Sequence, residues 1–258
     1  MTRVNLEGIQ SFYASSNARQ IPLLGLGVYA IEAGKPTEDA VLWALHAGYR
    51  HIDTAAYYGN EASVGNAIRK SGIPRDQIFV TTKLHDDDQG YESALAACEL
   101  SLEKLGLDYI GVSNYGVHHL KELLGSNPTI RPVVNQIEAK IVSFCESQHI
   151  AIEAFSPLSR GHKLQDPVLN KIATKYGKSP AQVMIRWGLQ KGYIVLPKSA
   201  RKDRIEQNAD VFDFDLADGD MNLLDSLNEG YVSGECFDMP FWGPYPSSCM
   251  SDLKDSRD

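Results

Sequence analysis

Apolar and polar positions follow two different patterns along this chain. Short, nearly continuous apolar runs, of the kind that form buried strands, recur between residues 21 and 199. Between them lie longer segments in which apolar residues return every three or four positions, the spacing of an amphipathic helix. After the first apolar run, for example, Ala40, Trp43, Ala44 and Ala47 share one helical face. The pattern therefore predicts strands and helices in alternation.

The predicted elements follow one another with short connections. Strands are expected at 21–29, 49–56, 77–84, 107–114, 132–139, 150–158 and 193–199. Helices are expected at 37–48, 60–72, 90–106, 117–126, 141–149, 166–177, 179–192, 201–211 and 218–230. Thr37 and Asn60 are expected to cap two of these helices, and Ser179 followed by Pro180 is typical of a helix start.

This order predicts parallel strands, because a crossover between parallel strands needs a connection the size of a helix. We expect an α/β fold, a TIM-type (β/α)8 barrel formed by one domain over residues 1–258, with an irregular tail from about residue 231. Seven strand–helix units are recognisable, whereas a complete barrel has eight. The stretch LDYIGVSN at 107–114 combines the start of one strand with the end of another. We therefore expect roughly one strand–helix unit to be missing between residues 110 and 111.

Composition excludes several classes of function. The 258 residues are 43% hydrophobic and 22% charged, which suits one large domain. A net charge of -8 repels phosphate backbones, so no nucleic acid is expected as a partner. No apolar run reaches the ~18 residues of a membrane helix, and no signal-peptide pattern is present, so we expect a cytoplasmic protein without a membrane partner. No metal is expected, because the Cys/His spacing of metal sites is absent. Cys98, within a helical pattern, is expected to be a buried free thiol.

Polar side chains fall where the predicted strands end, the position of active sites in parallel barrels. Asp53 ends one apolar run, Tyr58 lies just after it, and Lys83 closes another. Asp53 would keep Lys83 charged, and Lys83 would lower the pKa of Tyr58 from about 10 toward working pH. Tyr58 would then act as a general acid.

Each of these residues also has a simpler interpretation when it is taken alone. Asp53 suits a turn cap, Tyr58 a packed aromatic residue, and Lys83 a solvated lysine at a strand end. A different chemistry also fits a lysine at a strand end, because such a residue in some barrel aldolases forms a Schiff base with a carbonyl substrate. The combination of the three residues favours acid catalysis by Tyr58 over these alternatives.

An ordered series of motifs resembles the aldo-keto reductases. The motifs are GLGVYA, YRHIDTAAYYGNE, FVTTKL, SLEKLGLDYI, GVSNY, NQIEA, AFSPL and LPKSARKDRIEQN, and they run from about residue 21 to residue 216. The resemblance implies an eight-stranded α/β barrel, usually monomeric, that reduces aldehydes and ketones with NADPH. Its substrate would be a small-molecule carbonyl compound. Tyr58 matches the catalytic acid of the family, and Lys83 and Asp53 match its supporting pair.

The resemblance also implies a cofactor site. Ser113, Asn114 and Gln136 match the residues that bind the nicotinamide carboxamide, and Phe155 takes the place of the aromatic ring that stacks on the nicotinamide. Ser156 and Leu158 match the pyrophosphate loop. The residues that match the group around the adenosine 2′-phosphate are Lys198, Ser199, Arg204 and Asn208. The cations among them offer charge-assisted bonds to a phosphate dianion, which favours NADPH over NADH.

The chain departs from the family pattern at the proposed excision. The segment that carries the family's catalytic histidine is absent there, and no residue matches that histidine. His85 and Tyr29 stand where the family usually has tryptophans that line the substrate pocket. His85 could partly replace the missing imidazole, but we expect both residues to be pocket walls. Trp242, in the apolar tail segment 241–245, is expected to line the pocket as well.

Two functions follow from this comparison. The first is an NADPH-dependent aldehyde or ketone reductase, with Tyr58 as general acid. The second is a catalytically impaired NADPH-binding pseudoenzyme, or a truncated isoform, because the family's histidine and one strand–helix unit are missing.

Overall fold

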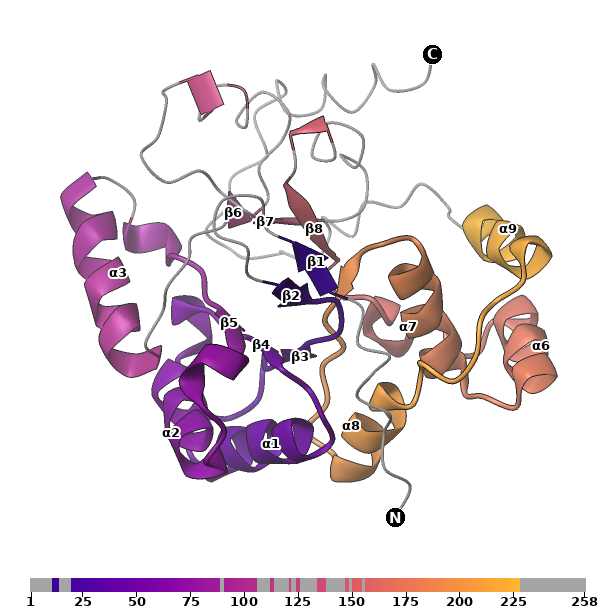
Figure 1. The fold of residues 1–258 in the computed structure, drawn as a ribbon, viewed down its shortest axis with the longest axis horizontal. Helices are drawn as coiled ribbons and strands as arrows, with labels where there is room; N and C mark the ends of the chain where they lie inside the picture. The colour runs from indigo at the N-terminus through magenta and orange to yellow at the C-terminus, as the bar shows by residue number, and fades with distance from the viewer. Residues whose placement is uncertain are drawn as a thin grey trace.

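Parallel strands form the centre of the molecule, and helices pack around them (Figure 1). This computed structural model describes residues 11–13, 20–88, 91–105, 112–113, 121, 124–125, 134–137, 147–148, 150–154 and 156–227. A short antiparallel hairpin of β1 (Ser11–Tyr13) and β2 (Gln20–Pro22) precedes the parallel strands.

The parallel strands form two hydrogen-bonded sets. The first set, in spatial order, is β3 (Leu26–Gly27), β4 (His51–Asp53) and β5 (Phe79–Thr81). The second is β6 (Val112–Ser113), β7 (Val134–Ile137), β8 (Ala151–Ala154) and β9 (Ile194–Val195). Parallel bridges from Leu24 to Val195 and from Gly27 to Lys198 join the two sets. The described parallel strands therefore follow the order β5-β4-β3-β9-β8-β7-β6, and each lies within a predicted strand. The hairpin of β1 and β2 was not predicted.

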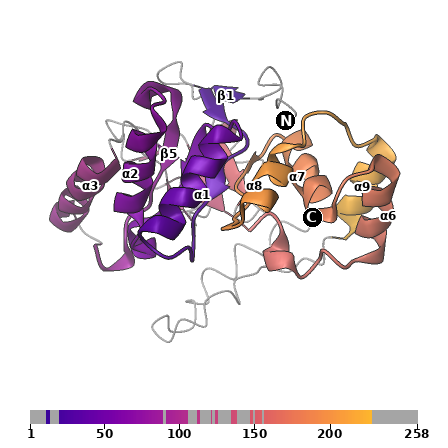
Figure 2. The ribbon, with the colours of Figure 1, turned by 90° about the horizontal axis from the view of Figure 1, so that it is seen from below.

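Helices follow the strands as the sequence predicts. They are α1 (Lys35–His46), α2 (Glu61–Ser71), α3 (Tyr91–Leu105), α6 (Pro167–Tyr176), α7 (Pro180–Gln190), α8 (Lys202–Ala209) and α9 (Asp218–Ser226). In the view from below, α1, α2 and α3 lie on one side of the molecule, and α6, α7 and α9 lie on the other (Figure 2). The predicted helices at 117–126 and 141–149 lie largely outside the described residues, and the tail from residue 231 lies wholly outside them.

The helix ends agree only in part with the predicted caps. Ser179 forms a capping box with Gln182, as its position before Pro180 predicts. The prediction that Thr37 caps a helix is wrong, because α1 begins two residues earlier and Gly34 is its N-cap. The Thr37 hydroxyl instead donates to the Glu32 carbonyl oxygen at 2.7 Å and so ties the first turn to the preceding loop.

The main hydrophobic core lies between the strands and the helices α1, α2, α7 and α8. Ile21, Leu26, Ile52 and Leu45 are among its fully buried side chains. Helices α2 and α3 approach closely at Gly65, where a Cβ atom would lie 2.0 Å from the Lys104 carbonyl oxygen. Only glycine fits at that contact, which fixes α2, and the loop before it, against the next helix.

The outer face of α3 carries apolar side chains exposed to solvent. Leu100 and Leu102 are 52% and 48% exposed, and Cys98 is exposed as well. The prediction that Cys98 is buried is therefore wrong. Helix α3 buries its other side, with Ser101 and Leu105, against the rest of the molecule. Among the residues that the structure describes, no helix has the length and apolar character needed to cross a membrane.

Candidate active site

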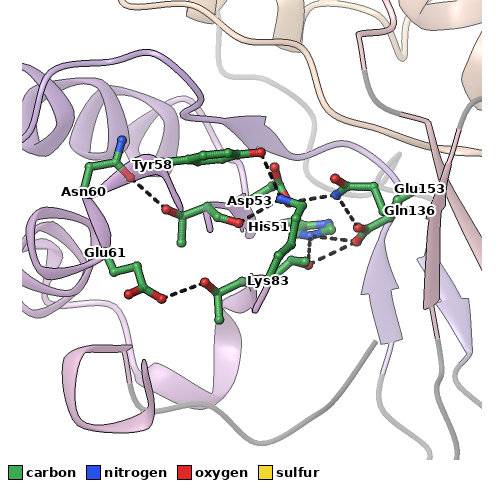
Figure 3. Close-up of polar contacts among 11 residues, drawn as sticks. His51, Asp53, Tyr58, Asn60, Glu61, Lys83, Gln136 and Glu153 are labelled. Carbon is green, nitrogen blue, oxygen red and sulfur yellow. Dashed lines mark hydrogen bonds and ion pairs between the residues drawn. The ribbon is translucent and has the colours of Figure 1, made fainter. Parts of the chain in front are cut away.

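Three polar side chains from the predicted strand ends meet at one point (Figure 3). Asp53 is the last residue of β4, Tyr58 ends the 3₁₀ helix η2 (Ala56–Tyr58), and Lys83 lies two residues after β5. Lys83 Nζ donates to Asp53 Oδ1 at 2.7 Å, to the Thr54 carbonyl oxygen at 2.8 Å and to Tyr58 Oη at 3.2 Å. The ammonium group thus connects the carboxylate to the phenol. We call these three residues the Tyr58–Lys83–Asp53 set.

Lys83 is held in its charged form. Its side chain is 16% exposed and that of Asp53 is 7% exposed. Burial pushes the pKa of Lys83 down, but Asp53 and Tyr58 outweigh burial and hold it above the ordinary lysine value. A Schiff base begins with attack by a neutral amine, so this environment disfavours the aldolase-type alternative.

The pKa of Tyr58 lies above the ordinary tyrosine value. Burial is the largest cause, and the opposing effect of Lys83 is smaller. The prediction that Lys83 brings this pKa down toward working pH is therefore wrong in its net direction. The result still suits a proton donor, because a phenol with a raised pKa is protonated throughout the neutral range.

A buried asparagine fixes the turn that carries Tyr58. Asn60 accepts a hydrogen bond from the Thr54 hydroxyl at 2.8 Å and donates to the carbonyl oxygens of Val28 and Ile31 at 3.0 and 3.1 Å. Gly59, between Tyr58 and Asn60, has a φ of 68°, which glycine adopts without strain. The position of the phenol therefore depends on contacts to the strand end at Thr54 and to the loop after β3.

Further polar side chains fill the barrel interior beside this set (Figure 3). Gln136 of β7 donates through Nε2 to Asp53 Oδ1 and to Glu153 Oε2, each at 2.9 Å. Glu153 of β8 also accepts from the Thr81 hydroxyl at 3.1 Å, and its Oε1 lies 3.3 Å from His51 Nε2. The family resemblance implies that Gln136 binds the nicotinamide carboxamide. In this structure its amide connects two buried carboxylates.

Sequence reasoning missed His51 and Glu153. Both interrupt short apolar runs, His51 in RHID and Glu153 in AIEA. Charged residues are almost never fully buried unless they are paired, so each was a signal for a buried partner. The sequence alone does not show that the two belong together, because they lie on strands far apart in the chain.

A separate buried carboxylate connects α2 to β5 and α3. Glu61, 2% exposed, accepts from the hydroxyls of Thr82 and Ser101 at 2.7 and 2.9 Å and pairs with Lys104 at 2.9 Å. Figure 3 shows Glu61 on the side of Lys83 away from Glu153. This contact supports the packing of the helices, and among the residues that the structure describes no hydrogen bond or ion pair joins Glu61 to Asp53.

The predicted phosphate-binding residues divide into two buried and two exposed side chains. Ser199 and Asn208 are 6% and 4% exposed, whereas Lys198 and Arg204 are exposed. They lie on the segment after β9 and on α8, and Lys198 forms a bridge to Gly27 at the end of β3. The side-chain types, two cations with one hydroxyl and one amide, suit a phosphate dianion.

The other predicted cofactor residues are only partly described. Ser156, with a φ of 49°, begins the turn after β8, and its carbonyl oxygen accepts from the Ser159 amide at 2.8 Å. Leu158 packs against the main core. Ser113 ends β6, next to Gln136 in the strand register, and its side chain lies outside the described residues. Three predicted site residues lie wholly outside them: Asn114, Phe155 and Trp242.

Two aromatic contacts lie in or next to the 3₁₀ helix that carries Tyr58. Tyr29, 44% exposed, packs edge-on against the Tyr58 ring at 5.0 Å between centroids. His85 packs on Tyr57 at 5.4 Å, and its Nδ1 accepts the Asp87 amide hydrogen at 3.1 Å. In the neutral ring the proton is therefore on Nε2, which leaves a hydrogen-bond donor on the opposite edge.

Comparison with known sequences gives a consistent result. The model of the Aldo/keto reductase family matches residues 24–111 and 108–229. A 9,11-endoperoxide prostaglandin H2 reductase from Trypanosoma cruzi is 44% identical over 255 residues, covering 83% of this chain and 90% of the relative. A glyoxal reductase from Bacillus subtilis is 42% identical over 252 residues, covering 83% of this chain and 91% of the relative.

Solved structures show the same fold. An aldo/keto reductase from Brucella melitensis superposes with a TM-score of 0.77 at 39% identity, covering 85% of this chain and 99% of that one. An aldo-keto reductase from Bombyx mori in complex with NADP superposes with a TM-score of 0.79 at 32% identity, covering 92% of this chain and 98% of that one.

This chain belongs to the aldo-keto reductase family. The fold is accordingly a TIM-type barrel, as predicted. Membership implies an oxidoreductase that carries out NADP-dependent carbonyl reduction.

Proposed function

We propose that this protein reduces aldehydes or ketones to alcohols with NADPH and that Tyr58 is its general acid. The observation that carries the proposal is the position of Lys83 Nζ, which bonds both Asp53 Oδ1 and Tyr58 Oη at 2.7 and 3.2 Å. A partly buried phenol in contact with an ammonium group is both a proton donor and a site where the resulting phenolate is stabilised. The name of one relative, a glyoxal reductase, favours a reactive carbonyl compound as substrate.

The charges around the predicted phosphate site support NADPH. Arg201 and Lys202 pair with Asp203 and Glu206, at 2.5 and 3.7 Å. Lys198 and Arg204, in the same basic segment, have no carboxylate partner among the residues that the structure describes. The available cations are thus the two that the family resemblance assigns to the adenosine 2′-phosphate, which NADPH carries and NADH lacks.

The residues of the chain then divide the reaction between them. When bound, NADPH supplies the hydride that the carbonyl carbon accepts. Tyr58 Oη donates its proton to the carbonyl oxygen, and Lys83 Nζ stabilises the phenolate that remains. Asp53 keeps Lys83 charged and in place at 2.7 Å.

The direct test mixes the pure protein with NADPH and a panel of aldehydes and ketones that begins with glyoxal. We expect the absorbance of the reduced nicotinamide to fall only when a carbonyl compound is present. A folded protein that oxidises no NADPH with any compound of the panel would argue against the proposal.

Arg204→Ala is expected to weaken NADPH binding about 10–100-fold and to leave NADH binding unchanged. A hydrogen bond to a charged group contributes about 1.5–3 kcal/mol, and only NADPH offers the phosphate. Quenching of the protein's three tryptophans by each cofactor measures both affinities. Arg201→Ala is the matched control, because Arg201 is already paired with Asp203. Equal losses for NADPH and NADH, or an equal effect of the control, would contradict the assignment.

We also propose that the chain lacks about one strand–helix unit between residues 110 and 111, so that seven units remain. The family model matches two segments that meet at 108–111. The alignment with the prostaglandin H2 reductase is 255 residues long but includes only 83% of this 258-residue chain. The remaining aligned positions are gaps in this chain, so the relative contains residues that this chain lacks. The exposed Leu100 and Leu102 on α3 are consistent with the loss of a neighbouring helix.

The missing unit favours a second candidate function, an NADPH-binding protein without turnover. It would lack the imidazole that the family places near the catalytic tyrosine. Tryptophan quenching by NADPH without reduction of any carbonyl compound would support this second function. Turnover that depends on Tyr58 would exclude it.

His85→Phe distinguishes a pocket wall from a replacement for the missing imidazole. Phenylalanine keeps the contact with Tyr57 but removes the Nε2 donor. If His85 is a pocket wall, the variant loses at most one hydrogen bond from Nε2 to the substrate. We then expect KM to rise about 3–10-fold and kcat to change little. Steady-state kinetics with one aldehyde provide the measurement. A fall in kcat of about 100-fold would instead assign an acid–base role to His85.

A further inference from the structure

A buried histidine–glutamate pair lies inside the barrel beside the Tyr58–Lys83–Asp53 set (Figure 3). His51 comes from β4 and Glu153 from β8, and neither side chain has any exposed surface. His51 Nε2 lies 3.3 Å from Glu153 Oε1. Thr81 Oγ1 lies 3.0 Å from His51 Nε2 and 3.1 Å from Glu153 Oε1. Residues from three strands therefore meet at one buried position.

The contacts of the His51 ring indicate which of its nitrogens donates. His51 Nδ1 contacts the Pro22 carbonyl oxygen at 3.2 Å, and because a carbonyl only accepts, Nδ1 carries a proton. A carboxylate facing an unprotonated Nε2 would be a buried charge without a cation. A proton between Nε2 and Oε1, on either the imidazole or the carboxyl group, would remove that charge. In both cases the pair has no net charge.

The amide of Gln136 connects this pair to Asp53. Its Nε2 donates one hydrogen to Glu153 Oε2 and the other to Asp53 Oδ1, each at 2.9 Å. Two carboxyl oxygens around one amide nitrogen fix the orientation of the amide. Asp53 Oδ1 is also the oxygen that accepts from Lys83 Nζ at 2.7 Å. A continuous series of contacts thus leads from His51 and Glu153 to Lys83.

We infer that His51 and Glu153 are positioning residues that hold the Tyr58–Lys83–Asp53 set in place from inside the barrel, through the amide of Gln136. The inference rests on the proposed carbonyl reduction and adds residues to the same site. The pair joins β4, β5, β7 and β8, none of which contains residues 110 and 111. It therefore supports the reacting phenol independently of the segment where the family's histidine is missing.

The surroundings of Glu153 define which charges its removal would disturb. Among the described residues, the titratable groups that face it are His51 and Asp53 of β4 and Lys83 after β5. β7 contributes the amide of Gln136, and β9 contributes no titratable side chain. Burial raises the pKa of Glu153, and His51 opposes this effect. Both are consistent with a proton shared between the two residues.

Glu153→Gln tests the inference with a nearly isosteric change. Glu153 presents an acceptor to His51 and Thr81 and a second acceptor to Gln136, whereas an amide presents one acceptor and one donor. One orientation of the new amide loses the contact with Gln136. The other keeps it but turns the amide nitrogen toward His51 and Thr81, so the Thr81 hydroxyl loses its acceptor on residue 153 and a protonated Nε2 of His51 would face another donor. We expect kcat to fall about 10-fold or more, because small displacements of a reacting group have large effects on the rate. The KM for NADPH should be unchanged.

Glu61→Gln is the matched control. Glu61 is equally buried and accepts from two hydroxyls, but it connects helices and not the Tyr58–Lys83–Asp53 set. We expect it to lower the urea midpoint of unfolding without changing kcat per folded molecule. If Glu153→Gln does not fold, Thr81→Val removes only the hydroxyl between Glu153 and His51 and should lower kcat in the same direction. Equal effects of Glu153→Gln and Glu61→Gln on kcat would overturn the inference.

A titration of Tyr58 separates this inference from the proposed function. The ultraviolet difference spectrum follows the phenol without any turnover, and comparison with Tyr58→Phe assigns the signal. In Glu153→Gln we expect the transition at higher pH than in the unchanged protein, because Lys83 is no longer held at 3.2 Å from Oη. An unchanged titration would contradict the positioning role even in a protein that reduces carbonyls. A shifted titration in a protein without turnover would support the positioning role and contradict only the proposed function.

Discussion

Tyr58→Phe is expected to reduce kcat for carbonyl reduction by about 100–10,000-fold, the usual contribution of a positioned general acid. Phenylalanine lacks the hydroxyl that bonds Lys83 Nζ at 3.2 Å, so the carbonyl oxygen would receive no proton from this position. The ring itself remains, and with it the edge-on contact with Tyr29 at 5.0 Å. The loss should therefore appear in turnover and not in folding. Oxidation of NADPH under saturating aldehyde provides the measurement.

A second tyrosine gives the control for this variant. Tyr176 lies on α6, far along the chain from η2. Its hydroxyl donates a hydrogen bond to Asp220 at 2.6 Å. Tyr176→Phe removes a phenol of the same kind and should leave kcat unchanged. NADPH binding, followed by tryptophan quenching, should be the same in both variants. If Tyr58→Phe kept more than about a tenth of the activity, another group would have to supply the proton.

The dependence of the rate on pH follows from the environment of Tyr58. Burial raises the pKa of the phenol above the ordinary tyrosine value, although Lys83 lowers it in part. The reactive form of a general acid is the protonated form, which therefore persists across the neutral range. We expect the rate of reduction to be flat through neutral pH and to decline only on the alkaline side, as Tyr58 loses its proton.

The strand-end residues could be predicted because topology alone brings them together. In a parallel barrel all strands end at the same rim, so Asp53 and Lys83 had to lie near each other once the strand–helix order was recognised. The distance of 2.7 Å between their charged atoms agrees with that reasoning. The capping box at Ser179 could be predicted for a similar reason, since it depends only on residues 179–182.

The interior pair could not be predicted, because its two residues are related only through the complete barrel. His51 and Glu153 lie on β4 and β8, which do not pair with each other, and each appears singly within an apolar run. The sign of the pKa change at Tyr58 was missed for a related reason. It depends on the balance between burial and the charge of Lys83, and burial is a property of the folded chain.

Lys83→Met is expected to have the largest effect on stability. It leaves the Asp53 carboxylate, 7% exposed, without its cation, and breaking a buried ion pair from one side typically costs about 3–5 kcal/mol. Burial pushes the pKa of Lys83 down, but Asp53 and Tyr58 hold it above the ordinary value. The contribution of the pair is therefore fully present below the ordinary pKa of lysine and is lost only as the pH rises through the raised value. Urea unfolding near neutral pH measures the difference.

The double variant Lys83→Met/Asp53→Asn shows whether the loss comes from the unpaired charge. Asparagine at position 53 still offers an oxygen to the Gln136 amide, which donates to Asp53 at 2.9 Å in the unchanged protein. With no isolated charge left in the barrel, the double variant should be more stable than Lys83→Met alone. Both variants should lack turnover, because neither keeps an ammonium group beside Tyr58. If the two mutations instead lowered stability additively, Asp53 and Lys83 would be independent residues at the barrel rim and not one ion pair.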